Sequence, residues 1–338
     1  MTSEKGLKSE ETIRRVLAEY DLSPDKARPV RGGCQVDTIE GKRLLKRSWR
    51  TQEALDLAYE ATDYLMSQGF KHIAPIRLSK YGDPWVKENG QLYYLTDWIT
   101  GKEFIMDRPA KLKEGIQALA RMQSAAIGFV PSSDHSRERR ETWGERFQGK
   151  LAELERCREL VEGIEEPSEF DSLFLTEVDG FIERGKTSIQ MLEQADYKTL
   201  VEEARQEGGI CHRDFVGTNL IRNRRREVFI VNFDNCHLDL KVFDLGRLLA
   251  WALPGFGWDF DLVVSLLAEY TESIPLKKDD LRLLAAYLCF PQRMWFLSRR
   301  HYLEPVPEPG AMDMIQEVLV EQPVHQEFMR QCIRHYRL

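Results

Sequence analysis

The spacing of apolar residues changes near residue 100 from mixed strand and helix patterns to mainly helical ones, and this change limits the folds that the chain can adopt. Before residue 100 the sequence predicts strands near 28–32, 34–39, 42–48, 73–79 and 91–98 and a long helix over 51–68. After it, helical periodicity dominates, with a single β excursion at about 219–235. A chain of 338 residues with 42% hydrophobic residues can bury the cores of two lobes. We expect an α+β fold with a small antiparallel β-sheet lobe at 1–100, holding about five strands, and a large mainly helical lobe at 101–338.

The helices expected in the second lobe are defined by their apolar spacing. They are 110–127, 142–163, 168–193, 196–206, 242–253, 258–273, 278–289, 290–303 and 311–336.

Charge and cysteine content exclude several classes of protein. The net charge of −7 disfavours general binding to nucleic acids or anionic membranes. The six cysteines contain no C-x-x-C pair, so neither a disulfide framework nor a zinc site is expected. No run of 18 apolar residues occurs and the first residues lack an apolar signal core, which predicts a cytoplasmic protein without a membrane span. The basic run Arg222–Arg226 is expected to be a solvated hairpin tip rather than a nucleic-acid site.

The segment Cys211–Leu220, CHRDFVGTNL, matches the pattern H-R-D-x-x-x-x-N. Phosphoryl transfer needs positioned phosphates, metal ions against their charge, and a carboxylate that takes the proton of the acceptor hydroxyl. Asp214 is therefore the candidate catalytic base and Asn219 a candidate metal ligand. A structural interpretation stays open, in which Asp214 caps a helix and His212 is satisfied in the core.

The residues that follow this loop extend the same pattern. An apolar strand is expected to end in Asn232-Phe233-Asp234, where a kinase holds its metal-binding carboxylate. Residues two apart in a strand face the same side, so Asn232 and Asp234 are both candidate metal ligands. Asp244 can cap the next helix or brace the catalytic loop.

The first lobe supplies candidate residues for a nucleotide. Lys46, on the third expected strand, is the candidate phosphate-binding lysine, although it could also be a surface lysine. Glu60 on the following helix is the candidate partner for Lys46, with Glu53 as a second choice. The segment LTDWITG is expected to be a strand that ends at a glycine, as does the hinge that contacts adenine in kinases. Asp97, Trp98 and Ile99 of this segment are the candidate cofactor-binding residues.

With these features the chain resembles the aminoglycoside phosphotransferase/choline kinase branch of the protein-kinase-like fold. Within that branch it is most similar to the CotS family of spore coat proteins from endospore-forming bacteria. The resemblance covers about residues 10–335 and is carried by LLK, YLTDWITGKEF, CHRDFVGTNLI, VNFDNCHLDLKVFDLGRLL and FPQRMWFLSRRHYLE. It implies a bilobal kinase-like fold with an ATP site that uses Mg²⁺. It also implies synthesis in the cytoplasm of the mother cell and assembly onto the spore coat with other coat proteins.

Three departures from the superfamily leave catalysis open. Asn232 stands where relatives carry a metal-binding Asp, and a neutral amide is a poorer ligand for a hard dication. Gln123 stands where relatives often have His, and Arg31-Gly32-Gly33-Cys34 is a degenerate glycine-rich loop. One interpretation is a nucleotide-binding pseudokinase or weak phosphotransferase that contributes to coat assembly. The alternative is an active ATP-dependent kinase acting on a small-molecule hydroxyl or a coat protein.

Overall fold

The computed structural model describes residues 10–132, 142–304 and 310–338. Contacts divide these residues into two compact units. The first holds 10–106, 110–132 and 204–244, and the second holds 107–109, 142–203 and the described residues from 245 to the end. The expected catalytic loop therefore belongs to the same compact unit as the N-terminal sheet, although a boundary near residue 100 would separate them by sequence.

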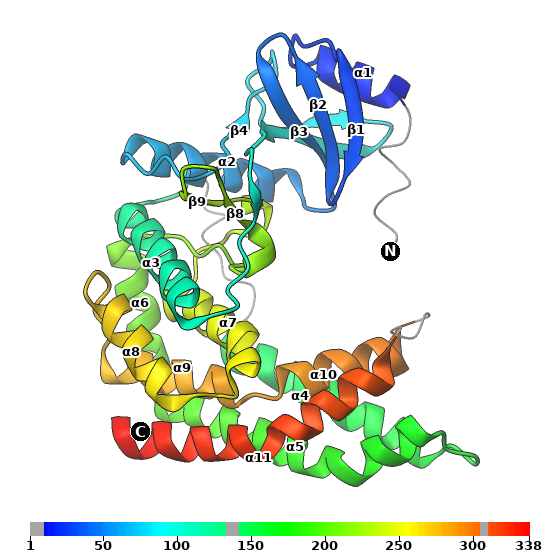
Figure 1. Cartoon of the computed structure of the whole chain (residues 1–338), viewed down its shortest axis with the longest axis vertical. Coiled ribbons are helices and arrows are strands. Elements are labelled where there is room, and N and C mark those ends of the chain that lie inside the picture. The colour runs from blue at the N-terminus through cyan, green and yellow to red at the C-terminus, as the bar shows by residue number, and fades with distance from the viewer. Residues whose placement is uncertain (1–9, 133–141, 305–309) are drawn as a thin grey trace. The chain divides into compact units, whose positions relative to one another are not determined.

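An antiparallel sheet forms the N-terminal part of the first unit (Figure 1). Helix α1 packs on it through Ile13, Val16 and Leu17, which share a core with Val36 and Leu45 of the sheet. The strands run in the order β1-β2-β3-β6-β4, and β5 also pairs with β6. The bounds are α1 Glu10–Ala18, β1 Lys26–Val30, β2 Gly33–Thr38, β3 Gly41–Ser48, β4 Ile76–Arg77, β5 Val86–Glu88 and β6 Gln91–Asp97.

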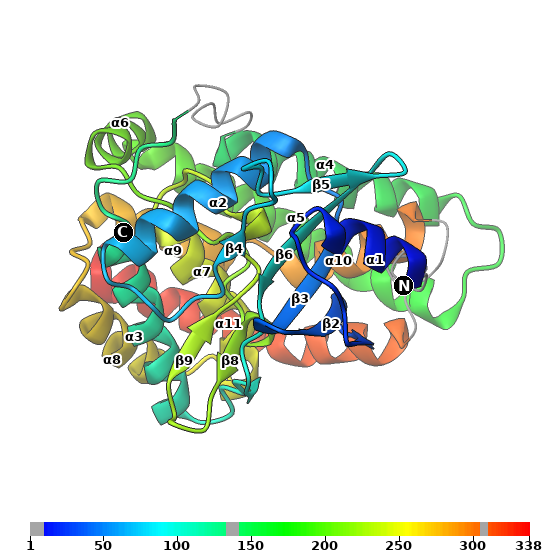
Figure 2. The same ribbon diagram turned by 90° about the horizontal axis from the view of Figure 1, so that it is seen from above.

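Helix α2 (Gln52–Ser67) follows β3 and begins at Thr51, whose hydroxyl accepts a hydrogen bond from the Ala54 N–H. Its buried face carries Leu55, Ala58 and Leu65. Seen from above in Figure 2, α2 runs beside the short strand β4. The helix thus continues directly from the strand that carries Lys46.

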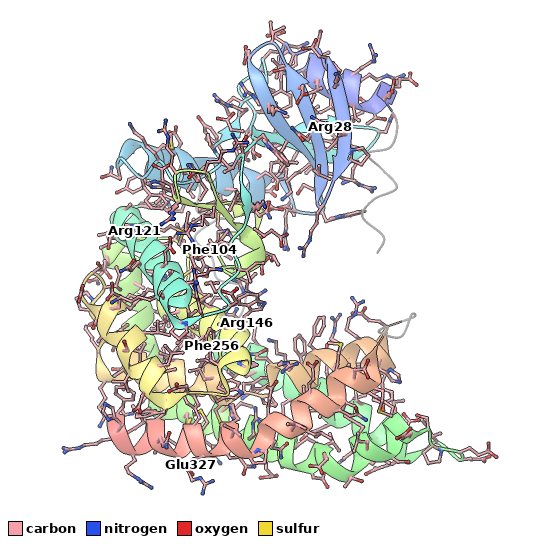
Figure 3. All side chains as sticks on the ribbon, in the orientation of Figure 1. Arg28, Phe104, Arg121, Arg146, Phe256 and Glu327 are labelled. Atoms are coloured by element: carbon pink, nitrogen blue, oxygen red, sulfur yellow. The ribbon has the colours of Figure 1, made fainter. Side chains whose placement is uncertain are left out.

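A second, three-stranded sheet lies in the same unit and has the order β7-β8-β9. Its strands are β7 (Lys102–Glu103), β8 (Leu220–Arg222) and β9 (Val228–Ile230). Residues 224–226 at the β8–β9 tip are exposed, and Arg222 pairs with Glu114 and lies over the ring of Phe104, a buried residue labelled in Figure 3. The basic run is therefore a hairpin tip, and its first arginine, Arg222, makes contacts within the same compact unit.

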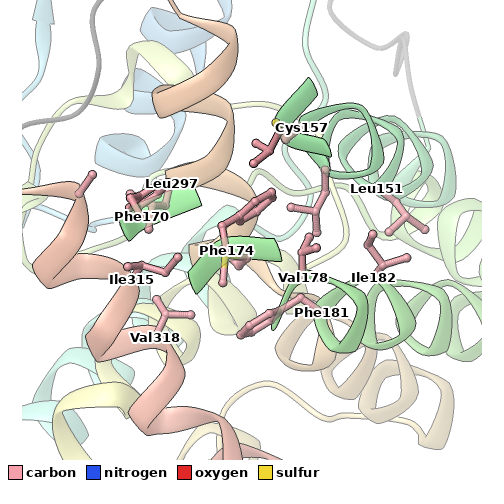
Figure 4. Packing of buried hydrophobic residues seen from close by; sticks show 14 residues of the cluster. Leu151, Cys157, Phe170, Phe174, Val178, Phe181, Ile182, Leu297, Ile315 and Val318 are labelled. Carbon is pink, nitrogen blue, oxygen red and sulfur yellow. The ribbon is translucent and has the colours of Figure 1, made fainter. Parts of the chain in front are cut away.

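The second unit consists of helices around an apolar core. Figure 4 shows Phe174, Val178 and Phe181 of α5 packed with Ile315 and Val318 of α11. Its helices are α4 Trp143–Glu162, α5 Glu169–Gln194, α8 Phe260–Thr271, α9 Lys278–Cys289, α10 Gln292–Ser298 and α11 Ala311–Tyr336. Helices α3 (Pro109–Ala126), α6 (Tyr197–Glu207) and α7 (Val242–Ala252) cross the boundaries between the segments of the two units.

Capping explains where the helices α4 and α5 begin. Thr142 and Glu145 form a capping box at the start of α4, and Ser168 and Asp171 form one at the start of α5. In each box the hydroxyl accepts from the backbone of the third helical residue, whose carboxylate accepts from the cap. Both helices start within one residue of the starts predicted from apolar periodicity, at 142 and 168.

The expected fold class is confirmed: an antiparallel sheet is joined to a mainly helical part. Several details differ from expectation, and two of them concern the lengths of elements. The first sheet has six strands because Val86–Glu88 pairs with β6, and this three-residue strand is too short to give a periodic signal. The helix expected over 290–303 ends as an α-helix at Ser298 and continues as a π-helical turn over Arg299–Leu303. Among the described residues, no helix is both long and apolar enough to cross a membrane.

Candidate nucleotide site

The Asp244 carboxylate holds the backbone of the predicted catalytic loop by two hydrogen bonds. Its two carboxylate oxygens accept hydrogen bonds from the backbone N–H groups of His212 and Arg213, each at 2.7 Å. Arg213 has a φ of 61°, in the left-handed region that is unusual for a side chain of this size. Asp244 is fully buried, so these charge-assisted bonds fix a strained turn. Of the two roles open to Asp244, the structure supports bracing of the loop.

His212 is buried, as the structural interpretation expected. Its Nε2 lies 2.8 Å from the carbonyl oxygen of Val231, which can only accept, so Nε2 carries the proton. Its Nδ1 then accepts a hydrogen bond from the Asp214 N–H at 3.2 Å. The imidazole connects the loop to the segment that follows β9 and orients the backbone of Asp214.

Asp214 and Asn219 meet across the loop. The Asn219 amide nitrogen donates to the Asp214 backbone oxygen and to its carboxylate, both at 2.8 Å. The short 3₁₀ helix η2 (Gly217–Asn219) brings them together. It starts after Val216 without a side-chain cap, so Asp214 does not serve as a helix cap there.

Lys46 reaches the same place from β3. Its Nζ donates to Oδ1 of Asn232 at 2.9 Å and lies 3.4 Å from a carboxylate oxygen of Asp234. It also lies over the ring of Tyr94, 5.1 Å from the ring centre. Lys46 is 9% exposed, so it is not the surface lysine that the sequence left open.

Lys46, Asn232, Asn219 and Asp214 form one continuous chain of hydrogen bonds. The Asn232 amide nitrogen donates to Oδ1 of Asn219 at 2.6 Å, and Asn219 in turn donates to Asp214. The residues at the two ends of this hydrogen-bond series, Lys46 and Asp214, fix the orientation of both amides. A lysine ammonium can only donate and a carboxylate can only accept, which leaves one consistent arrangement of the two amides between them. We call these four residues the amide relay.

Burial and charge act in opposite directions on Lys46. Burial lowers the pKa of Lys46, while the carboxylates of Asp234 and Asp214 raise it in part. Tyr94 has its pKa raised well above the usual value by burial and by the nearby Asp234 charge. The Lys46 ammonium is therefore packed against Tyr94 on one side and faces negative charge on the other.

Asn232 adopts a backbone conformation that the sequence did not predict. Its φ of 68° and ψ of 53° place it in the left-handed region, and Phe233–Asn235 forms the 3₁₀ helix η3. Asn232 and Asp234 are thus not two positions of one strand, which corrects the expectation that the pleat aligns them. They meet at Lys46 because the chain turns, and Asn is among the residues that tolerate this turn best.

The residues expected around the rest of the nucleotide have other contacts. Glu60 accepts hydrogen bonds from the backbone and hydroxyl of Ser132, so Lys46 is paired with Asn232 and Asp234 instead of Glu60. Asp97 forms a two-pronged ion pair with Arg77 at 2.8 and 2.7 Å. These side chains were assigned by their place in the sequence alone, and pairing over such separations has no local signal.

The hinge and the glycine-rich loop are both short. The Trp98 N–H donates to the Lys42 carbonyl at 3.2 Å, and the half-buried Ile99 follows directly. The β1–β2 turn consists of Arg31 and Gly32, with the φ of Gly32 at 79°. This two-residue hairpin turn offers fewer backbone N–H groups to a phosphate than a six-residue glycine-rich loop does.

The comparisons with known proteins agree with this geometry. A family model described as "Spore coat putative kinase YutH" matches residues 14–332. The chain belongs to this family. Spore coat protein S of Bacillus subtilis (strain 168) is 28% identical to the YutH-family chain over 302 residues, which are 87% of this chain and 85% of the relative. The predicted resemblance to spore coat proteins with a kinase-like fold is confirmed.

Solved structures with the same fold are phosphotransferases. An aminoglycoside phosphotransferase from Alicyclobacillus acidocaldarius has a TM-score of 0.83 and 21% identity, covering 96% of each chain. Spectinomycin phosphotransferase in complex with ADP and spectinomycin has a TM-score of 0.67 and 13% identity, covering 96% of this chain and 99% of that one. At these identities the likeness shows the fold of the YutH-family chain.

The donor set of the YutH-family chain fits a magnesium ion poorly. Mg²⁺ is held by oxygen atoms, usually with one or two carboxylates. Here the Asn219 oxygen accepts from Asn232, the Asn232 oxygen accepts from Lys46, and the Asp234 carboxylate is paired with Lys46. Over the described residues, no group of three or more Asp, Glu, His and Cys could hold a metal. A dication could enter only if the amide relay rearranged.

Two contributors to the site were missed or left without a role by the sequence interpretation. Tyr94 lies directly opposite Lys46 in the β3–β6 register, which only the strand pairing reveals. Gln123 donates to the Lys241 carbonyl at 2.9 Å and so helps to hold the segment just before Asp244. An amide can make this bond, which gives Gln123 a structural use where relatives often carry His.

Proposed function

We propose that this chain is a kinase-like spore coat protein that binds an adenine nucleotide weakly and transfers phosphate slowly or not at all. The observation that carries the proposal is the 2.6 Å hydrogen bond from Asn232 to Asn219. It occupies the amide oxygen that a kinase turns toward its metal ion. The role in the coat is structural, and the nucleotide pocket serves binding more than turnover.

The charges around Lys46 support weak nucleotide binding. Asp214 and Asp234 together carry more negative charge than Lys46 can balance, and Arg50 acts on Lys46 only through its charge. The negative charges of Asp214 and Asp234 would therefore repel the nucleotide phosphates. Without a good metal site the phosphates lack the ions that would hold them in line, and transfer loses the positioning on which it depends.

An active kinase is the second candidate because hydrogen bonds hold the Asp214 loop in place. Asp244, His212 and Asn219 all hold it in place, and the Asp214 carboxylate keeps its position at the end of the relay. In that case Asp214 would accept the proton of a hydroxyl on a small molecule or a coat protein. Lys46 would hold the phosphates, and Asn219 with Asp234 would share the metal after rearrangement.

The family also guides the proposal about partners and location. Its description and the relative from Bacillus subtilis both refer to the spore coat. We expect synthesis in the mother cell and assembly onto the coat through other coat proteins. This part can fail independently of nucleotide binding, because a coat protein needs no functional nucleotide site.

The proposal is tested by thermal unfolding with ATP, with and without magnesium, beside an assay of phosphate release. Lys46→Met removes the phosphate contact, and Lys42→Met on the exposed side of the same strand is the matched control. A ligand that binds only the folded state raises the melting temperature. A modest shift that Lys46→Met abolishes and Lys42→Met retains, with no phosphate release, supports a pseudokinase. Magnesium-dependent release overturns it in favour of the active kinase, and no shift in the unmutated chain removes the nucleotide from the proposal.

A further inference from the structure

The helical unit contains a small cavity, lined mostly by apolar atoms, that is separate from the amide relay. It has a volume of about 40 Å³ and lies between α5, the junction of α9 and α10, α11 and the segment with Trp258 that precedes α8. The side chains that carry its chemistry are Arg184, Trp258, Gln292, Gln322 and His325. Each water needs roughly 10–15 Å³ measured in this way, so the cavity has room for about three water-sized groups.

Four of these side chains have a buried polar atom without a hydrogen-bond partner among the described residues. They are the indole nitrogen of Trp258, the amide nitrogen of Gln292, the amide oxygen of Gln322 and Nδ1 of His325. Such atoms are rare in folded proteins, and each one costs about 1–3 kcal/mol when left unpaired. Their concentration around one cavity indicates that something polar fills it.

The hydrogen-bonding role of two of these atoms is fixed by their neighbours. His325 Nε2 lies 2.9 Å from the Leu288 carbonyl and must donate to it, so Nδ1 is an acceptor. Burial and the Arg184 charge lower the pKa of His325 to about 3, which keeps it neutral. Gln292 accepts from Lys150 through its oxygen at 2.7 Å, so its unpaired nitrogen is a donor.

Arg184, Arg293 and Glu321 are the charged side chains that line the cavity. The Arg184 guanidinium donates to the Cys289 carbonyl at 3.2 Å and lies 5.2 Å from the ring centre of Phe181. No carboxylate of the described residues forms an ion pair with Arg184: Glu321 is paired with Arg293 and acts on Arg184 only through its charge. Its packed surroundings lower the pKa of Arg184 to about 10, so it is charged at neutral pH.

We infer that this cavity is a binding site for a small oxyanion that retains one hydroxyl group, of the size of hydrogencarbonate. Its charged oxygens accept from Arg184, Trp258 and Gln292. Its hydroxyl donates to one of the two acceptors, Nδ1 of His325 or the Gln322 oxygen. The bound anion links α5, α11 and the α9–α10 junction and stabilises the helical unit.

Water alone is a poorer occupant than an anion. Water molecules can pair the dipoles of Trp258, Gln292 and His325, but they bring no negative charge to Arg184, on which Glu321, itself paired with Arg293, acts only through its charge. A charge partly withdrawn from water is costly, and a direct ion pair recovers part of that cost. The four unpaired atoms around the cavity are two donors and two acceptors, which suits an occupant that both accepts and donates hydrogen bonds.

The test is thermal unfolding of the full chain at pH 8 in sodium hydrogencarbonate, compared with sodium chloride at equal ionic strength. Arg184→Met removes the charge, and Trp258→Phe removes only the indole N–H. Arg330→Met, on the exposed side of α11, is the matched control. Line broadening of ¹³C-labelled hydrogencarbonate in NMR spectra reports binding directly.

We expect hydrogencarbonate to raise the melting temperature by several degrees in the unmutated chain and in Arg330→Met, to do so less in Trp258→Phe, and to leave Arg184→Met unchanged. Line broadening should follow the same order. If Arg184→Met does not fold, Trp258→Phe and the NMR measurement still decide. The inference is overturned by an equal shift in chloride, by an equal shift in Arg184→Met, or by the absence of a shift and of line broadening in the unmutated chain.

Discussion

The Nζ atom of Lys46 lies 2.9 Å from Oδ1 of Asn232, although 186 residues separate them along the chain. This bond decides the chemistry of the whole site. It orients the Asn232 amide so that its nitrogen faces Asn219, and it thereby closes the place where a kinase holds a metal ion. A single amide thus joins Lys46 to Asn219 and, through it, to Asp214 in one hydrogen-bonded relay.

Asn232→Asp is expected to open this site to magnesium. The substitution removes the N–H donor and sets a carboxylate against the Asn219 oxygen, so the two repel until a cation lies between them. Asp also tolerates the left-handed backbone of residue 232. We expect magnesium-dependent ATP binding to tighten at least several-fold, measured by thermal shift or calorimetry. Asn235→Asp adds the same charge nearby and is the control; an equal gain there would contradict the role of Asn232.

Asp244→Ala should destabilise the chain strongly. It leaves the buried N–H groups of His212 and Arg213 without acceptors, at about 1–3 kcal/mol each. We expect a loss of about 2–5 kcal/mol in the free energy of unfolding, measured with urea. Asp259→Ala removes a partly exposed helix cap and should cost only about 1 kcal/mol. Equal losses in the two variants would show that Asp244 does not brace the loop.

Gly33→Ala tests the close approach of β2 to β3. A Cβ at this position would lie 2.5 Å from the Leu45 carbonyl and 3.2 Å from Cγ of Lys46. The backbone atom cannot move without disturbing the sheet, so we expect a loss of about 1–3 kcal/mol and weaker ATP binding. Gly149→Ala, in α4 with open space around it, should instead stabilise the chain slightly. Unchanged stability in Gly33→Ala would mean that the sheet can separate at this point.

His325 should make the chain sensitive to acid. Its pKa is about 3 in the folded chain and about 6.5 when unfolded, so between these values only the unfolded state binds the proton. The contribution of neutral His325 to the free energy of unfolding is fully present above pH 6.5 and is lost as the pH falls toward 3. Between pH 7 and pH 5 we expect it to account for a loss of about 2 kcal/mol in the free energy of unfolding.

His325→Gln keeps a donor for the Leu288 carbonyl and does not titrate, so it should flatten that part of the stability curve. His335→Gln, at an exposed position of the same helix, should leave the curve unchanged. Urea unfolding at several pH values measures both variants. Parallel curves for His325→Gln and the unmutated chain would refute the role of His325.

The helical part of the fold was predictable because its signals are local. Apolar residues repeat at helical spacing, and Ser or Thr caps with an acid three residues later mark the starts of α4 and α5. The short strands β5 and β7 were not predicted, since two or three residues carry no period and their existence depends on partners elsewhere in the chain.

The sequence by itself determined the fold class, the family and the residue types of the candidate site, because Asp214, Asn219, Asn232 and Lys46 stand at recognisable positions. Only the tertiary structure decided their partners. Lys46 bonds to Asn232 and Glu60 to Ser132, and the turn at Asn232 brings Asp234 to Lys46 without a strand between them. A hydrogen bond depends on distances of a few tenths of an ångström between atoms remote in sequence, and no local pattern of residues encodes them.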